Sequence, residues 1–383
     1  MKAIYLDNAA TTKIDSDVLE LMHISMQENF GNPSSTHQFG RKAKSALETA
    51  RKNIAQHFNV SASEIIFTSG GTEADNLILH NAVLNLGVQR IITSRIEHHA
   101  VLHTCEFLER IHNIKLDFVN VDKFGNIDLC HLKDLLSNSN DKTLVSLMYI
   151  NNEIGNILPA DEVSALCKNY NALFHSDTVQ AIGHYNLDLQ NTPIDFIAAS
   201  AHKFHGPKGV GFAYFKKGFG VLPMFYGGDQ EKGARSSTEN VHAILGMEKA
   251  LEIAVANLDS DKEHIEKIKQ YFISEFQTLS KHISFNGLSS NLNTSSYTIL
   301  SVCFPLSNDM FLFSLDMAGI AVSGGSACQS GSLKGSHVLS EILKADELSK
   351  TSVRFSFSKF TTKEEIDITL AQIKELLSSS LII

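Results

Sequence analysis

The segment Ile65-Ile-Phe-Thr-Ser-Gly70-Gly71-Thr-Glu-Ala-Asp-Asn76 runs from an apolar strand pattern through a two-glycine turn into a helical pattern. Seven short β-branched or apolar runs, typical of strands, cover residues 65–68, 90–93, 115–119, 143–150, 172–175, 195–199 and 210–215. Helical patterns lie between them at residues 73–86, 99–111 and 160–170. This alternation predicts an α/β fold with a mostly parallel sheet covered by helices on both faces.

Amphipathic helix patterns flank this region. Apolar residues keep the i, i+3, i+4 spacing over residues 43–58 before it and 265–279 after it. A polar interruption at residues 257–261 follows a helical run and indicates a domain boundary. The C-terminal remainder mixes strand patterns with a helical pattern. We therefore expect a large domain of residues 16–257 and a smaller α+β domain of residues 1–15 and 258–383.

The composition is that of an ordinary globular protein, since the 383 residues are 43% hydrophobic and 20% charged, with a net charge of −9. A mild acidic excess gives no electrostatic footprint for nucleic acid or for an anionic membrane surface. No run reaches the roughly 18 apolar residues of a spanning helix, and the N-terminus lacks the apolar core of a signal peptide. We expect a cytoplasmic protein with neither nucleic acid nor membrane as a partner.

The five cysteines are far apart and form no CxxC pair, which argues against a disulfide framework or a closed zinc site. Cys105, Cys130 and Cys167 lie in helical patterns, and Cys303 lies in a strand pattern. We predict that these four are small buried residues. Cys328 differs, because nine of the fourteen residues at 323–336 are serine or glycine.

Four junctions at the ends of predicted strands are unusually polar, and ligands of open α/β sheets bind beyond the carboxyl ends of strands. The first is the Gly70-Gly71-Thr72 turn. It offers backbone N–H groups and the positive end of a helix dipole to a phosphate, although an ordinary helix start has the same pattern. The turn matches neither GxGxxG nor GxxxxGK[ST], so a Rossmann or P-loop nucleotide site is disfavoured.

The other three junctions carry an acid, a lysine and histidines. Asp177 directly follows a strand, where an aspartate is more often a helix N-cap. Lys203 stands between a strand and a Gly-Pro turn, where desolvation favours the neutral amine that a Schiff base requires. His98 and His99 open a helix. His99 and His103 could share a metal ion, but no third ligand is nearby, so no metal site is predicted.

One cofactor fits the four junctions better than any other. Pyridoxal phosphate needs a phosphate cradle, a lysine that joins its aldehyde, an acid that keeps its pyridine nitrogen protonated, and a flat group over its ring. An anion site, Lys203, Asp177 and His98 supply these in turn. The sequence therefore predicts a pyridoxal phosphate site at the carboxyl edge of the sheet.

Motifs over almost the whole chain fit one known family. They are Tyr5-Leu-Asp-Asn-Ala-Ala-Thr-Thr12, Gly31-Asn-Pro-Ser-Ser35, the four junctions, Gly233-Ala-Arg-Ser-Ser-Thr238 and Val353-Arg-Phe-Ser356. The most specific are Ser200-Ala-His-Lys203 with the following Gly-Pro-Lys-Gly, and the stretch around Cys328 that ends in Ser336-His-Val-Leu339. Together they resemble the cysteine desulfurases of the class V aminotransferase group. The resemblance implies a fold-type I pyridoxal phosphate enzyme with a seven-stranded, mostly parallel sheet and a smaller α+β domain.

The resemblance also implies roles for the residues around the cofactor ring. Lys203 would be the Schiff-base lysine and the base that removes the substrate α-proton. Asp177 would pair with the pyridine nitrogen, and Gln180 would donate a hydrogen bond to the phenolic oxygen. His98 would stack on the ring.

Further implied roles concern the phosphate and the subunits. Thr72, Ser200 and His202 would hold the phosphate, together with the backbone of Gly71. Thr238 would reach the phosphate of the neighbouring subunit, so the resemblance implies a homodimer.

The substrate is implied to be L-cysteine, with its carboxylate held by Asn152 and Arg354. The local pattern agrees for Arg354, because it alternates with the apolar residues Val353 and Phe355 and so lies on the polar face of a strand. The Cys328 thiolate would attack the substrate sulfur and leave a persulfide, with L-alanine as the product. A sulfur-acceptor protein, for iron–sulfur cluster assembly or for tRNA or cofactor thiolation, would then take the sulfur.

Three alternatives stay open: a selenocysteine lyase, a class V aminotransferase, or a catalytically silent sulfur-carrier subunit. Transamination has no use for a nucleophile such as Cys328, and the presence of Lys203, Asp177 and His98 together argues against a silent subunit. The sequence leaves open whether Cys328 also ligates an iron–sulfur cluster transiently.

Three features depart from the family pattern. Gly71 stands where many relatives have alanine, and Lys359 stands where many have a second arginine. The chain also ends without the extension by which housekeeping members dock an iron–sulfur scaffold, which leaves the acceptor open. The stretch at residues 323–336 resembles the group with an extended loop, which favours a protein acceptor.

Overall fold

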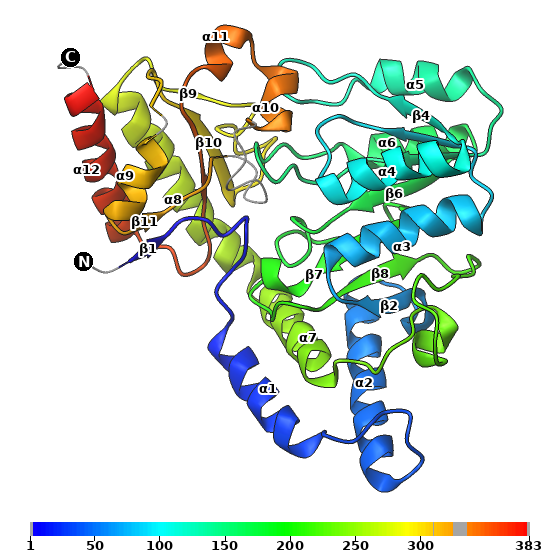
Figure 1. The fold of residues 1–383 in the computed structure, drawn as a ribbon. Coiled ribbons are helices and arrows are strands. Elements are labelled where there is room, and N and C mark those ends of the chain that lie inside the picture. The colour runs from blue at the N-terminus through cyan, green and yellow to red at the C-terminus, as the bar shows by residue number, and fades with distance from the viewer. Residues whose placement is uncertain (1–2, 309, 325–334, 381–383) are drawn as a thin grey trace.

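The computed structural model describes residues 3–308, 310–324 and 335–380. Figure 1 shows a larger part built on a wide sheet and a smaller part that contains the two ends of the described chain. The candidate cysteine Cys328 lies outside the described residues. None of the described helices is long and apolar enough to cross a membrane.

The sheet of the larger part has seven strands in the order β2-β8-β7-β6-β5-β3-β4. The strands are β2 (Ile65–Thr68), β3 (Arg90–Thr93), β4 (Lys115–Phe118), β5 (Thr143–Ser146), β6 (Leu173–Asp177), β7 (Phe196–Ser200) and β8 (Gly211–Phe215). Only β8 runs antiparallel to its two neighbours within this sheet. The predicted mostly parallel seven-stranded sheet is confirmed, with β5 ending four residues earlier than its apolar run.

Helices cover both faces of this sheet (Figure 1). They are α1 (Ser16–Glu28), α2 (Gln38–His57), α3 (Gly71–Leu84), α4 (His99–His112), α5 (Leu129–Ser137), α6 (Ala160–Asn169) and α7 (Val241–Ala256). Successive strand residues point to opposite faces. Ile92 and Val145 therefore pack in one core with α2, α5, α6 and α7, whereas Ile91 packs in a second core with α3 and α4.

The smaller part holds a three-stranded antiparallel sheet in the order β12-β10-β9. Its strands are β9 (Ser284–Phe285), β10 (Ile299–Cys303) and β12 (Ser352–Ser356), and its helices are α8 (Leu258–Leu279), α9 (Phe311–Met317), α11 (Ala345–Leu348) and α12 (Lys363–Ser380). Phenylalanines of α8 and β12 form a third core. Short strand β1 (Ile4–Tyr5) pairs with β11 (Ile320–Ala321), so the N-terminal segment packs against this part.

Two observations bear on the predicted domain boundary. Helix α7 ends at Ala256 and α8 begins at Leu258, so the polar run at 257–261 is mostly the first turn of a helix. Helix α10 (His337–Ile342) packs on Ile96 and Ile154 of the larger part, although it comes late in the chain. The division into domains at residue 257 stays a prediction.

Three of the four cysteines predicted to be buried are so, namely Cys105, Cys167 and Cys303. The prediction is wrong for Cys130, which is exposed on α5. Helix α5 buries Leu132 and Leu136, which are four residues apart and share one face. Cys130 lies two positions before Leu132, about 200° around the helix, and therefore faces solvent.

Candidate active site

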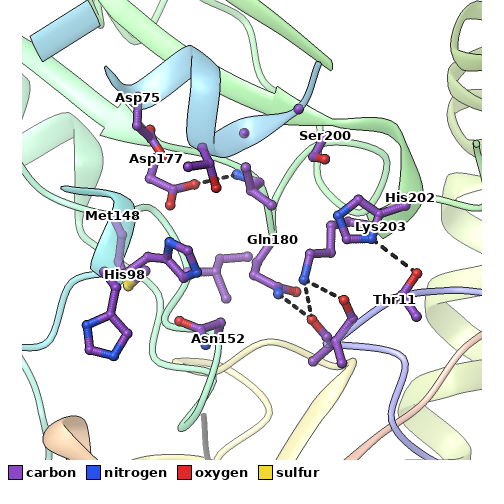
Figure 2. A pocket seen from close by; sticks show the side chains of 18 of the residues that line it. Thr11, Asp75, His98, Met148, Asn152, Asp177, Gln180, Ser200, His202 and Lys203 are labelled. Atoms are coloured by element: carbon purple, nitrogen blue, oxygen red, sulfur yellow. Dashed lines mark hydrogen bonds between the residues drawn. The ribbon is translucent and has the colours of Figure 1, made fainter. Parts of the chain in front are cut away.

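A cavity of about 470 Å³ lies where the carboxyl ends of β2, β3, β5, β6 and β7 meet the smaller part. Ten residues that sequence analysis placed at the cofactor or substrate line it: Gly71, Thr72, His98, Asn152, Asp177, Gln180, Ser200, His202, Lys203 and Arg354. Figure 2 shows the acids at one end of the pocket and Lys203 with His202 at the other. The four polar junctions therefore converge on one cavity.

Lys203 ends the 3₁₀ turn η2 (Ala201–Lys203), which directly follows β7. Its Nζ donates hydrogen bonds to the carbonyl oxygens of Ala9 at 2.6 Å and Ala10 at 2.9 Å. Gln180 Nε2 donates to the same Ala9 oxygen at 2.9 Å (Figure 2). The N-terminal segment thus supplies acceptors that orient both side chains, and sequence analysis missed this role of Ala9 and Ala10.

Asp177 is the last residue of β6. Its Oδ1 accepts a hydrogen bond from the backbone N–H of Val179 at 2.9 Å, as an aspartate at a turn does. Burial raises the pKa of Asp177, and the charges of His98 and Lys203 oppose that rise. A cation placed against this carboxyl group would favour its anionic form.

His98 is the N-cap of α4 and accepts a hydrogen bond from the backbone N–H of Ala100 on its Nδ1, at 3.1 Å. This bond fixes the ring at the wall of the cavity. Burial lowers the pKa of His98, with a further lowering from Lys203 and His337 against the opposing charge of Asp177. A neutral imidazole with a fixed plane suits stacking on a flat ring.

The first turn of α3 supplies the anion-binding groups. Its N-cap Gly70 has φ +152° and is followed by Gly71 and Thr72, whose backbone N–H groups stand at the positive end of the helix dipole. A Cβ on Gly71 would lie 2.6 Å from Val179 Cγ2. Val179 therefore occupies the space that a methyl group at position 71 would need.

His202 completes this end of the cavity with Ser200. Its Nδ1 lies 3.1 Å from Thr11 Oγ1, which leaves Nε2 for a ligand. Burial, Lys203 and Lys208 lower the pKa of His202 to about 4, so the ring is neutral near pH 7. Its Nε2–H can then donate to a phosphate oxygen without adding charge.

Arg354 of β12 reaches the cavity from the smaller part, on the opposite face of the strand from Val353 and Phe355 of the core. Its Nη2 lies 2.8 Å from Asp7 Oδ1, and its Nη1 donates to the carbonyl oxygen of Asn152 at 2.8 Å. Its Nε has no hydrogen-bond partner among the described residues. Arg354 therefore lies beside Asn152, the other residue predicted to hold the substrate carboxylate, and its partner Asp7 was not foreseen.

The predicted site residue Thr238, and Lys359, which departs from the family pattern, both lie outside this cavity. Thr238 is exposed and does not line this cavity. Its loop is tied to α3 by Arg235, whose Nε donates to Glu73 Oε1 at 2.8 Å. Lys359 lies outside the cavity as well, where its Nζ pairs with Asp15 Oδ2 at 2.6 Å.

The cavity contains further residues to which sequence analysis gave no cofactor or substrate role. They include Asp75, His99, Met148, Glu153, Val179 and His337. His99 stacks on His103 with ring centroids 4.8 Å apart. In the described part of the chain no group of three or more His, Cys, Asp or Glu side chains could hold a metal ion.

The chain matches known proteins over nearly its whole length. The family model for Aminotransferase class-V covers residues 4–369. Cysteine desulfurase IscS of Dictyoglomus turgidum is 41% identical over 380 residues, 98% of this chain and 95% of that relative. Putative cysteine desulfurase IscS 1 of Bacillus subtilis is 41% identical over 372 residues, 96% of each chain.

Solved structures give the same result. A NifS-like protein has a TM-score of 0.90 at 38% identity, over 98% of this chain and 99% of that one. A NifS-like protein from Rickettsia africae has a TM-score of 0.87 at 32% identity, over 98% and 99% of the two chains. The chain therefore belongs to the class V aminotransferase family, in its group of cysteine desulfurases.

Proposed function

We propose that this protein is a pyridoxal phosphate-dependent cysteine desulfurase that converts L-cysteine to L-alanine and passes the sulfur, as a persulfide on Cys328, to an acceptor. The observation that carries the proposal is the convergence of Lys203, Asp177 and His98 with Arg354 around one cavity. Membership of the cysteine desulfurase group supports it.

The residues present fit the cofactor. The narrow space at Gly71 and the N–H groups of the first turn of α3 form a cradle for a phosphate, with Thr72, Ser200 and His202 beside it. Asp177 lies at the other end of the cavity, where it would pair with the pyridine nitrogen, and Gln180 would donate to the phenolic oxygen. When bound, pyridoxal phosphate supplies an aldehyde that joins amines covalently and a ring that accepts electron density.

The side chains around the cavity would then have separate roles in the reaction. Arg354 and Asn152 would bind the substrate carboxylate and so orient the α-carbon. Lys203 would take the α-proton on Nζ, and the carbonyl oxygens of Ala9 and Ala10 would hold this amine in place for that transfer. The Cys328 thiolate would form a bond to the substrate sulfur as the carbon–sulfur bond breaks, and the remaining three-carbon product would take up protons to give alanine.

Assembly and partners follow from the same proposal. A second copy of the chain would bring its Thr238 to the phosphate, which accounts for the exposure of Thr238 away from the cavity of its own chain. A sulfur-acceptor protein, for iron–sulfur cluster assembly or for thiolation, would remove the sulfur. A similar protein of known structure, SspA, was solved in complex with cysteine, which supports cysteine as the substrate here.

The test uses the purified protein with added pyridoxal phosphate and a reductant. With L-cysteine, the wild type is expected to release alanine and sulfide in equal amounts, whereas Cys328→Ala should bind the cofactor but release almost no sulfide. Formation of a keto acid in place of alanine would support the aminotransferase alternative. Undiminished sulfide release by Cys328→Ala would contradict the proposal, and activity with selenocysteine alone would favour the lyase.

A further inference from the structure

A buried row of polar side chains lies behind Asp177 and has no part in the proposed reaction. It consists of Ser146 on β5, His175 on β6 and Asp75 on α3. Ser146 and His175 are fully buried, and Asp75 is 1% exposed. Figure 2 shows Asp75 and Asp177 next to each other at one end of the pocket.

His175 bridges the other two residues. Its Nδ1 lies 2.8 Å from Ser146 Oγ, and its Nε2 lies 3.4 Å from Asp75 Oδ1. Neither Nε2 nor Oδ1 meets hydrogen-bond geometry with any described group, although both are buried. Burial lowers the pKa of His175 to about 3, so the imidazole is neutral and has one N–H donor and one acceptor nitrogen. If Nδ1–H donates to Ser146, Nε2 is the acceptor and needs a donor on Asp75.

The charges around Asp75 also favour a protonated carboxyl group at this position. The charges of two more buried carboxyl groups act on Asp75, namely Asp177 at the end of β6 and Glu97 just before α4. The cationic groups that act here, Lys203 on η2 and His98 when protonated, act on Asp177. Burial first, and then the charges of Asp177 and Glu97, raise the pKa of Asp75. Neighbouring buried carboxylates cannot all ionise without a large cost.

We propose that Asp75 holds a proton at neutral pH, directed toward Nε2 of His175, and is a positioning residue that leaves the negative charge at this end of the cavity on Asp177. With Nε2 accepting the hydrogen bond from Asp75, His175 carries its own proton on Nδ1 and donates it to Ser146 Oγ. The consequence for Asp177 rests on the proposed function, because it matters for a pyridine nitrogen bound there. The proton on Asp75 does not rest on it.

Infrared difference spectra of the cofactor-free protein at pH 7 test the proton directly. Subtracting the spectrum of Asp75→Asn from that of the wild type should reveal the carbonyl band of a protonated carboxylic acid. Glu97→Gln is the matched control, because the buried Glu97 carboxyl group is itself protonated at pH 7, and the same subtraction made in the Glu97→Gln background should still show the Asp75 band. A difference spectrum that shows only the bands of a carboxylate would overturn the proposal.

Cofactor affinity tests the positioning role. Asp75→Leu leaves Nε2 of His175 without a donor and should weaken binding of pyridoxal phosphate about tenfold. Asp75→Asn restores a neutral donor and should recover most of that loss, and circular dichroism shows whether either variant is misfolded. Equal losses in the two folded variants would contradict the role. If the acid band is present but the wild type releases no sulfide from L-cysteine, the proposed function fails and the proton assignment stands.

Discussion

The Nζ of Lys203 and the side-chain amide of Gln180 share the carbonyl oxygen of Ala9, more than 170 residues away in sequence. No sequence pattern could predict this contact, because a backbone carbonyl carries no residue signature. The roles of Lys203 and Asp177 could be proposed from the sequence, since an acid and a lysine directly follow strands whose ends meet. The position of Asp75 could not, because helical periodicity does not show what its side chain faces.

Lys203→Ala is expected to lose the visible absorbance of the covalently bound cofactor, because no other described lysine is placed to replace it between Ala9 and Ala10. Absorbance spectra of the protein after removal of free pyridoxal phosphate measure this. Lys217→Ala, at an exposed site after β8, is the matched control and should keep the wild-type spectrum. An unchanged spectrum of Lys203→Ala would remove this lysine from its role.

Arg354→Lys is expected to raise the KM for L-cysteine by about 10- to 100-fold, because hydrogen bonds between charged groups contribute about 1.5–3 kcal/mol. The planar guanidinium group contacts Asp7 and Asn152 through two nitrogen atoms, and the single ammonium group of a lysine cannot make both contacts in the same geometry. Steady-state kinetics measure the change. Lys359→Arg, outside the cavity, should leave KM unaltered, and an equal KM in Arg354→Lys would contradict the assignment.

At the scale of elements, the first turn of α3 decides the shape of the phosphate cradle. The strand, turn and helix of residues 65–84 could be predicted from the alternation of apolar and polar residues, and the structure confirms them. The contact between Gly71 and Val179 could not, because it joins two junctions that lie on different strands of the sheet.

Gly71→Ala should weaken pyridoxal phosphate binding about tenfold, because the new Cβ would meet Val179 Cγ2 at 2.6 Å and displace one of the two junctions. The double variant Gly71→Ala/Val179→Ala removes the clash and should restore most of the affinity. Fluorescence titration of the cofactor measures both. No recovery in the double variant would show that the effect of Gly71 does not act through Val179.

At the scale of the whole molecule, the cavity takes groups from the large sheet, the N-terminal segment and β12 of the smaller part. Sequence patterns predicted the parallel sheet and the later α+β region because strands and helices there keep their periodicity. They did not predict that α10 packs on Ile96 and Ile154, because apolar residues do not reveal which core they join.

Buried carboxyl groups near the cavity make the stability of the molecule depend on pH. Burial raises the pKa of Glu97 from 4.5 to about 8, with Ser94 and the backbone of Met148 opposing the rise and Asp177 adding to it. At pH values between 4.5 and 8, folding is therefore accompanied by uptake of a proton on Glu97. The contribution of Glu97 to the free energy of unfolding is fully present below pH 4 and is lost as the pH rises through 8.

Relative to Glu97→Gln, the wild type is expected to lose up to about 1.4 kcal/mol of unfolding free energy per pH unit between pH 5 and 8. Thermal unfolding of the two proteins at several pH values measures the difference. A difference in unfolding temperature that does not change with pH would show that Glu97 is ionised in the folded protein.

The central claim is that sulfur passes from L-cysteine to Cys328, and mass spectrometry tests it most directly. The holoenzyme is mixed once with isotopically sulfur-labelled L-cysteine without reductant, quenched with an alkylating reagent and digested. We predict that the peptide containing Cys328 gains the mass of one labelled sulfur atom, in an amount that matches the alanine formed. Alanine formation with labelled sulfur on another cysteine, or with no labelled peptide, would contradict the account.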